Sequence, residues 1–139
     1  FGIRAAKSDI SRGELNIDGY KAVTQQLADT FAFKYVAITL RESFSASYNG
    51  WSALLYDGEK YYQSKRYDIS PIVDRVGGGD SFGAGLIHSL LENKDPQSAV
   101  DFAVGASCLK HTILGDFNLV TTDEVGLLLK GNTSGRVQR

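Results

Sequence analysis

The chain has 139 residues, of which 42% are hydrophobic and 22% charged, and its formal net charge is −1. This composition is typical of one globular unit with its own hydrophobic core, and it excludes intrinsic disorder as the main state. Because the 15 basic and 16 acidic residues are interspersed, and because no apolar run reaches the roughly 18 residues of a membrane span, we expect a small-molecule partner rather than a nucleic acid or a membrane.

The first two predicted elements are a helix and a strand. Apolar side chains spaced three and four apart over residues 18–31 predict an amphipathic helix. Residues 35–40 (YVAITL) are short, partly β-branched and almost wholly apolar. This pattern predicts a parallel strand that is covered on both faces, although periodicity alone leaves a short buried helix open.

A β-hairpin is predicted next. Residues 51–56 and 60–65 flank Asp57-Gly58, a dipeptide favoured in tight turns whose two central residues both need positive φ. Several aromatic side chains of this region have the shape to stack on a nucleotide base, but cross-strand packing is the favoured interpretation. They are Trp51, Tyr56, Tyr61, Tyr62 and Tyr67.

Three helices are predicted in the second half of the chain. The first carries an apolar stripe and ends near Asn93; the stripe consists of Phe82, Leu86, Ile87, Leu90 and Leu91. For the second, Asp95 is a plausible N-cap and Pro96 stands at the first helical position, where its missing N–H matters least. The third starts at Thr121, with Glu124 at capping-box spacing. The order helix, strand, hairpin and helices predicts an α/β fold.

Three consecutive glycines, residues 77–79, stand where the loop meets the first of these helices, and Asp80 follows them. The first N–H groups of a helix have no internal acceptor, so a helix N-terminus favours an anion by roughly 0.3 to 1 kcal/mol, and by about 2 kcal/mol when partly buried. Glycine lets a phosphate approach closely because it has no Cβ. A carboxylate beside such a site makes sense if Asp80 accepts a proton from a hydroxyl that attacks the phosphate. A plain turn at the glycines, and an Asp80 that only complements the helix N-terminus, are the alternatives.

Two common nucleotide-binding motifs fail at this position. A Walker loop needs Gly-Lys-Ser/Thr, but Asp80-Ser81 follows the glycines. The dinucleotide pattern G-x-G-x-x-G meets Phe82 where its last glycine should stand.

The segment DRVGGGDSFGAG instead satisfies the pattern D-x-x-G-x-G-D-x-F-x-x-G, and in this it resembles the second signature of the ribokinase-like (PfkB) carbohydrate kinases. The fixed positions are Asp74, Gly77, Gly79, Asp80, Phe82 and Gly85. The resemblance covers essentially the whole chain and implies a ribokinase-like, Rossmann-like layered α/β fold. Residues 1–139 would be the C-terminal, nucleotide-binding portion of such a domain, without the N-terminal sugar-binding and lid portion. The absence of methionine also leads us to expect a fragment.

Within this family the chain is most similar to 2-keto-3-deoxygluconate kinases. The residues that carry this similarity are 72–85 (IVDRVGGGDSFGAG), 115–119 (GDFNL) and 135–137 (GRV). The similarity implies phosphorylation of 2-keto-3-deoxygluconate to its 6-phosphate by ATP, with Mg²⁺ as the accompanying metal. A kinase for another sugar or a nucleoside, and a nucleotide-binding module without catalysis, are the alternatives.

The resemblance also implies roles for individual residues. Asp80 would be the general base and contact the substrate hydroxyl, and the N–H groups of Gly77, Gly78 and Gly79 would form the anion hole for the ATP phosphates. Asp116 would contact the sugar acid, with a simple turn residue as its alternative. ATP would lie against the strand through Thr39, Arg41 and Ser43.

Asp74 matches the position that in several relatives helps to hold a monovalent cation, K⁺, and an ordinary loop carboxylate is its alternative. No direct ligand of Mg²⁺ is assigned. The missing N-terminal portion is an expected partner, so the fragment alone should be inactive, and a homo-oligomer stays open. The lone Cys108 is interpreted as an inert core thiol and fits a reducing, cytoplasmic compartment. His88 and His111 have no partner at metal-ligand spacing, so neither is given a role.

Overall fold

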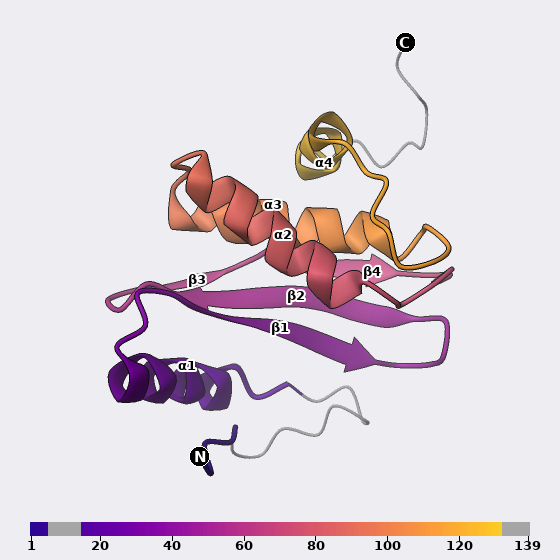
Figure 1. The fold of residues 1–139 in the computed structure, drawn as a ribbon. Helices are drawn as coiled ribbons and strands as arrows, with labels where there is room; N and C mark the ends of the chain where they lie inside the picture. Colours follow the sequence, from indigo (N-terminus) through magenta and orange to yellow (C-terminus); the bar gives the residue numbers. More distant parts are fainter. Residues whose placement is uncertain (6–14, 132–139) are drawn as a thin grey trace.

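The computed structural model describes residues 1–5 and 15–131, so residues 135–137 of the family resemblance lie outside the described part. Its helices are α1 (Ile17–Phe31), α2 (Gly78–Leu91), α3 (Pro96–Lys110) and α4 (Thr122–Leu129). Its strands are β1 (Val36–Ser43), β2 (Asn49–Tyr56), β3 (Tyr61–Gln63) and β4 (Tyr67–Ile69). The sheet has α1 on one face and α2 and α3 on the other, and α4 lies beyond α3 (Figure 1).

The sheet is antiparallel and is built around β2. Strand β1 pairs with one edge of β2, from Val36 opposite Tyr56 to Ser43 opposite Asn49, and β3 and β4 share the other edge. The prediction of a parallel strand is therefore wrong for the described chain. An apolar run indicates that both faces of a strand are covered, and here the two helical layers cover them. The run does not determine the direction of the neighbouring strand.

The hairpin is confirmed, with a longer turn than the dipeptide suggested. Only Gly58 of the pair has positive φ, at 94°, and β2 and β3 are separated by the four residues 57–60. The Asp57 carboxylate accepts hydrogen bonds from the N–H groups of Glu59 and Lys60, at 2.9 and 2.7 Å, and these bonds shape the wider turn. The rings of Tyr56 and Tyr61 stack with centroids 4.6 Å apart, which confirms aromatic packing across the hairpin.

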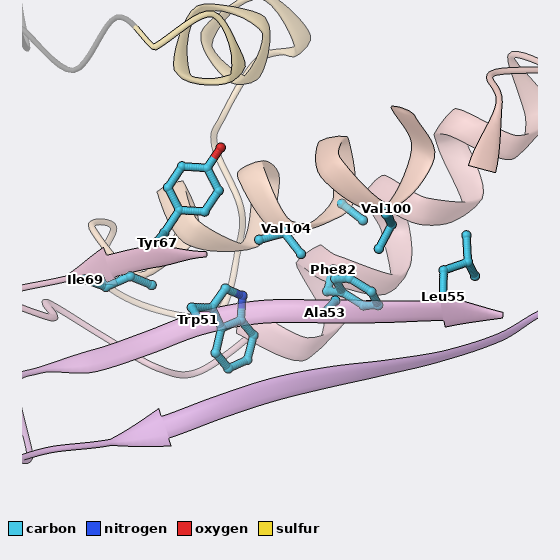
Figure 2. Packing of buried hydrophobic residues seen from close by; sticks show 9 residues of the cluster. Trp51, Ala53, Leu55, Tyr67, Ile69, Phe82, Val100 and Val104 are labelled. Atoms are coloured by element: carbon cyan, nitrogen blue, oxygen red, sulfur yellow. The ribbon is translucent and has the colours of Figure 1, made fainter. Parts of the chain in front are cut away.

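The main hydrophobic core lies between the sheet and the pair α2 and α3. Figure 2 shows β2 side chains pointing at residues of both helices. The members labelled there are Trp51, Ala53, Leu55, Tyr67, Ile69, Phe82, Val100 and Val104. A Cβ at Gly85 would lie 3.0 Å from the Ala103 Cα, so glycine at this position lets α2 and α3 pack closely.

The buried face of α2 differs from the predicted stripe. Ile87 and Leu91 are 60% and 75% exposed, and the buried residues of α2 are Gly78, Ser81, Phe82, Gly85 and Ser89. Small residues face α3 because the close approach of the two helices leaves room for little else. None of the helices that the structure describes is both long and apolar enough to cross a membrane.

Candidate functional site

The turn that leads into α2 is shaped by Gly77 and the loop around Asp116. Gly77 is the N-cap of α2 and has a φ of 76°. A Cβ at this position would overlap the backbone oxygen of Asp116 and would lie 2.7 Å from its Oδ1. The position therefore requires glycine for its positive φ and for the close approach of the neighbouring loop.

The backbone amides at the start of α2 are partly used by the chain itself. The Gly78 N–H donates to the carbonyl of Arg75 at 3.2 Å, and the Ser81 N–H donates to the carbonyl of Gly77 at 2.8 Å. The expectation that all three glycine amides are free is therefore wrong for Gly78, because its N–H closes the turn. No side chain caps α2, and the described residues offer no acceptor to the N–H groups of Gly77, Gly79 and Asp80.

A hollow of about 260 Å³ opens beside these amides. It is lined by Gly77, Asp80, Ser81, Ala84, Asp116, Phe117 and Asn118. Both Asp80 and Asp116 are exposed, so the two carboxylates expected to serve the substrate line one solvent-accessible cavity. A hydroxyl compound placed there would meet a carboxylate and unpaired helix N-terminal amides together.

Phe117 and Asn118 are lining residues that sequence reasoning did not single out as site residues. The Asn118 side chain is committed to the protein: its Nδ2 donates to the Ala106 carbonyl at 3.3 Å and its Oδ1 accepts from the Val120 N–H at 3.1 Å. Phe117 is 83% exposed. Their position directly after Gly115-Asp116 was the available signal.

Asp74 links the turn to the same loop. Its carboxylate accepts hydrogen bonds from the N–H groups of Val76, at 3.0 Å, and Gly115, at 2.8 Å. These two bonds, first that of Val76, hold the pKa of Asp74 below its ordinary value. In the described residues no three acidic, histidine or cysteine side chains gather as a metal site would require.

Residues at the C-terminal end of α3 hold the glycine turn in place. The Ser107 hydroxyl donates to the Gly78 carbonyl at 2.7 Å. The buried His111 ring donates through Nδ1 to the Ser107 carbonyl at 2.7 Å, and its Cε1 would lie 3.0 Å from a Cβ on Gly78. Burial lowers the pKa of His111, which favours the neutral ring. Sequence reasoning gave His111 no role, because a single histidine carries no spacing signal.

The three β1 residues expected near ATP lie on the face of the sheet that α2 and α3 cover. Thr39, Arg41 and Ser43 stand opposite Ala53, Trp51 and Asn49 of β2, and Trp51 and Ala53 belong to the core beneath α2 and α3. These β1 residues do not line the hollow that contains Asp80.

Arg75 links the β1–β2 loop to the start of α2. Its Nη2 donates to the carbonyls of Ser45, at 3.0 Å, and Ala46, at 2.8 Å. The loop between β1 and β2 is thereby fixed to the segment that precedes the glycine turn.

Cys108 and a second cavity lie outside the hollow beside α2. Burial raises the pKa of the Cys108 thiol to about 11, which agrees with an inert thiol. A larger hollow of about 740 Å³ lies around the turn between α2 and α3 and contains none of the predicted site residues. Its acidic groups are committed, because Asp95 caps α3 and Asp101 accepts from the Lys65 N–H at 3.0 Å.

Comparisons with known proteins agree with the family resemblance of the sequence. A family model described as pfkB family carbohydrate kinase matches residues 13–120. The chain is 30% identical over 132 residues to a 2-dehydro-3-deoxygalactonokinase of Haloferax volcanii, a match that covers 94% of this chain and 38% of that protein.

Solved structures give the same result for the fold. The 2-dehydro-3-deoxygluconokinase of Thermotoga maritima superposes with a TM-score of 0.80 at 44% identity, over 84% of this chain and 35% of that one. A PfkB family carbohydrate kinase of Listeria grayi superposes with a TM-score of 0.74 at 33% identity, over 83% of this chain and 35% of that one. The fold expected from the sequence is confirmed, and the chain spans about two fifths or less of these relatives.

Proposed function

The chain belongs to the pfkB family of carbohydrate kinases, and on this premise we propose that it carries the catalytic and nucleotide-binding residues of an ATP-dependent kinase for a 2-keto-3-deoxy sugar acid. The observation that carries the proposal is the shared hollow at the start of α2, with Asp80, Asp116 and unpaired amides around it. Because the chain covers 38% of its Haloferax relative, the activity is proposed for the complete protein.

Asp80 acts as the general base in this proposal. Its exposed carboxylate accepts the proton of the sugar hydroxyl while the hydroxyl oxygen attacks the γ-phosphorus of ATP. The new bond joins that oxygen to phosphorus, the bond between the γ-phosphorus and the bridging oxygen breaks, and ADP leaves with the electron pair. General base catalysis of this kind contributes about 10² to 10⁴ in rate.

The amides of Gly79 and Asp80 stabilise the phosphoryl group during transfer. They stand at the N-terminus of α2 without an acceptor in the described chain, so they can donate to oxygens on which negative charge develops. Fixed donors need no reorganisation at the moment of reaction. Gly77 supports them by keeping the turn compact against Asp116.

Mg²⁺ fits as an ion held mainly by the nucleotide. The described residues hold no cluster of three acidic, histidine or cysteine ligands, and Mg²⁺ often binds through substrate phosphates with few protein ligands. When bound, it neutralises charge on the phosphates. Asp80 and Asp116 are the exposed carboxylates of the hollow, and the proposal assigns both to the sugar substrate rather than to Mg²⁺.

The acceptor is proposed from Asp116 and from the names of the relatives. Asp116 lines the same hollow as Asp80, where it can accept a hydrogen bond from a second hydroxyl of the sugar acid. The relatives from Haloferax volcanii and Thermotoga maritima are both named as kinases of 2-dehydro-3-deoxy sugar acids. Equal turnover on ribose or fructose would contradict this acceptor class.

The substitution Asp80→Asn in the complete protein tests the proposed base. We expect turnover to fall by about 10² to 10⁴ while ATP binding, measured by calorimetry, is retained. Asp123→Asn is the matched control, because Asp123 is also an exposed acid in the first turn of a helix, α4. If Asp80 only complements the helix N-terminus, both variants should retain turnover, and that result would remove Asp80 from the mechanism.

A further inference from the structure

A buried serine of α3 donates a hydrogen bond to the start of α2. The Ser107 side chain has 0% exposure, and its hydroxyl donates to the Gly78 carbonyl at 2.7 Å. A serine inside a helix commonly donates to a carbonyl one turn earlier in its own helix, but this hydroxyl reaches a residue 29 positions away in another helix. Because both partners are buried, the bond is stronger than it would be in water.

The backbone of Ser107 is held in turn by His111. The buried ring of His111 donates through Nδ1 to the Ser107 carbonyl at 2.7 Å, and its backbone N–H donates to the Cys108 carbonyl at 3.2 Å. The His111 carbonyl accepts from the N–H groups of Val73, at 2.9 Å, and Asp74, at 3.3 Å. His111 therefore ties the last turn of α3 to the segment that precedes the glycine turn.

The Gly78 carbonyl and the Gly79 N–H belong to one peptide unit. Such a unit is planar and trans, so its C=O and N–H point in opposite directions, and a bond that fixes the carbonyl also fixes the direction of the N–H. The Gly79 N–H has no acceptor in the described chain and stands at the uncapped N-terminus of α2. A donor to the carbonyl also polarises the peptide unit, which makes its N–H a stronger donor.

This peptide unit would have unusual freedom without a bond of this kind. It joins two glycines of the run at residues 77–79, and a glycine adopts many more backbone conformations than any other residue. No side chain caps α2, and a Cβ at Gly79 would meet nothing within 4 Å. The hydrogen bond from Ser107 restricts rotation of the peptide unit from its buried side.

We propose that Ser107, held by His111, is a positioning residue of the phosphoryl transfer: its hydroxyl aims and polarises the Gly79 N–H that donates to the transferred phosphoryl group. The inference rests on the proposed kinase function, because it concerns the same amide. Ser107 does not line the hollow that contains Asp80, so it acts on the reaction through the Gly78–Gly79 peptide alone.

A purely structural role for Ser107 predicts different behaviour. The hydroxyl would then only join α3 to α2, and its removal would lower the free energy of unfolding without slowing the molecules that remain folded. A bond that aims a donor at developing charge instead slows the chemical step and leaves the binding of ATP nearly unchanged. The rate of the chemical step therefore separates the two roles.

The first experiment measures phosphoryl transfer from ATP to 2-keto-3-deoxygluconate in a single turnover of the complete protein. Loss of a fixed donor costs about 10² to 10³ in rate, and Ser107→Ala keeps the donor but loses its alignment, so we expect a smaller loss of about tenfold. The affinity for ATP, measured by calorimetry, should change by less than about twofold. A wild-type rate in Ser107→Ala would overturn the proposal.

Ser89→Ala is the matched control. Ser89 is also a serine with 0% exposure, but its hydroxyl has no hydrogen-bond partner among the described residues. We expect this variant to keep the wild-type rate, and an equal loss in both variants would contradict a specific role for Ser107. Ser107→Cys keeps the volume but has only a weak S–H donor. It should lose rate in the same direction, and it decides the test if Ser107→Ala does not fold.

The second experiment observes the Gly79 N–H by NMR without any substrate. When glycine carries carbon-13 at its carbonyl and nitrogen-15 at its amide, a coupled signal arises only where one glycine follows another, and in this chain those amides are Gly78 and Gly79. The signal that disappears in Gly79→Ala identifies the second of them. In Ser107→Ala we expect the Gly78 carbonyl and the Gly79 amide resonances to move, because the polarising donor is lost, and in Ser89→Ala to stay. Unchanged resonances in Ser107→Ala would also overturn the proposal.

The failure of the two proposals can be told apart. Absence of turnover by the wild-type protein on every sugar acid tested would reject the kinase function. The NMR comparison would still decide whether Ser107 aims and polarises the Gly79 N–H, because that readout needs no substrate.

Discussion

Helices α2 and α3 pack against each other, yet they begin in opposite ways. Helix α3 starts with the Asp95 side chain accepting from the Ser98 N–H at 3.0 Å, and Pro96 at its first position has no N–H to satisfy. Helix α2 starts at Gly77 with no side-chain cap. Two amides of its first turn, those of Gly79 and Asp80, have no acceptor in the described chain.

The other two helices follow the pattern of α3. Asn16 accepts from the Gly19 N–H at the start of α1, and α4 has a complete capping box. A side-chain cap stabilises a helix by satisfying amides that would otherwise have no partner. Among the helices that the structure describes, α2 alone lacks a side-chain cap. Its N-terminal amides border the hollow that both candidate carboxylates line. An unsatisfied helix N-terminus is thus a functional signal when side chains with matching chemistry gather around it.

Of the substitutions that test the difference between α2 and the capped helices, Gly77→Ala should cause the largest loss of turnover and stability. A methyl group at residue 77 would overlap the Asp116 backbone oxygen, and alanine is disfavoured at a φ of 76°. We expect turnover of the complete protein to fall by roughly 100-fold as the donors move, and the free energy of unfolding to fall by about 1 to 3 kcal/mol. Turnover assays and urea unfolding measure the two quantities.

Gly79→Ala is the matched control for stability. A Cβ at residue 79 meets nothing within 4 Å, and its φ is not positive. Alanine should therefore leave the fold intact or stabilise it by about 0.4 to 1 kcal/mol. Equal losses of stability in the two variants would show that glycine is not specifically required at residue 77.

The parts of this contrast that depend on neighbouring residues were predictable from the sequence. Asp95 and Thr121 were identified as caps from residue type and spacing, and the structure confirms both. The glycine turn before a helix was recognisable because no residue with a capping side chain stands at 77–79. Each of these features is determined within about four residues, the range over which helix capping acts.

Features set by distant contacts were not predictable in this way. The exposure of Ile87 and Leu91 depends on how closely α3 approaches α2. The support of Gly78 by Ser107 and His111 joins residues about 30 positions apart, and it leaves no local pattern. The direction of β1 was wrong for the same reason, because strand pairing is a tertiary contact.

The substitution Asp74→Asn should have the next largest effect, a loss of stability that depends on pH. Because hydrogen bonds from Val76 and Gly115 depress the pKa of Asp74 in the folded state, its carboxylate stabilises the fold above the unfolded pKa of about 3.9. That contribution is lost as the pH falls through the lower folded pKa. We expect the variant to be less stable than wild type at pH 7, with the difference shrinking below about pH 4.

Urea unfolding of both proteins over this pH range measures the difference. Other acids with depressed pKa values, such as Asp57 and Asp95, titrate in both proteins and cancel in the comparison. A stability difference that stays constant down to pH 3, about one pH unit below the unfolded pKa, would show that the Asp74 charge does not stabilise the link to Gly115.

The substitution Thr121→Ala should have the smallest effect and should leave the reaction untouched. It removes the hydroxyl that accepts from the Glu124 N–H at 3.3 Å, so the free energy of unfolding should fall by about 1 kcal/mol. Thr122→Ala, one residue further on and also exposed, removes a hydroxyl that does not cap the helix and serves as the control in urea unfolding. Turnover should stay within about twofold of wild type, because the amides at this helix start are satisfied by Thr121 rather than by a ligand. If Thr121→Ala lost as much turnover as Gly77→Ala, capped and uncapped helix N-termini would contribute alike to the reaction. The functional role assigned to the uncapped N-terminus of α2 would then be wrong.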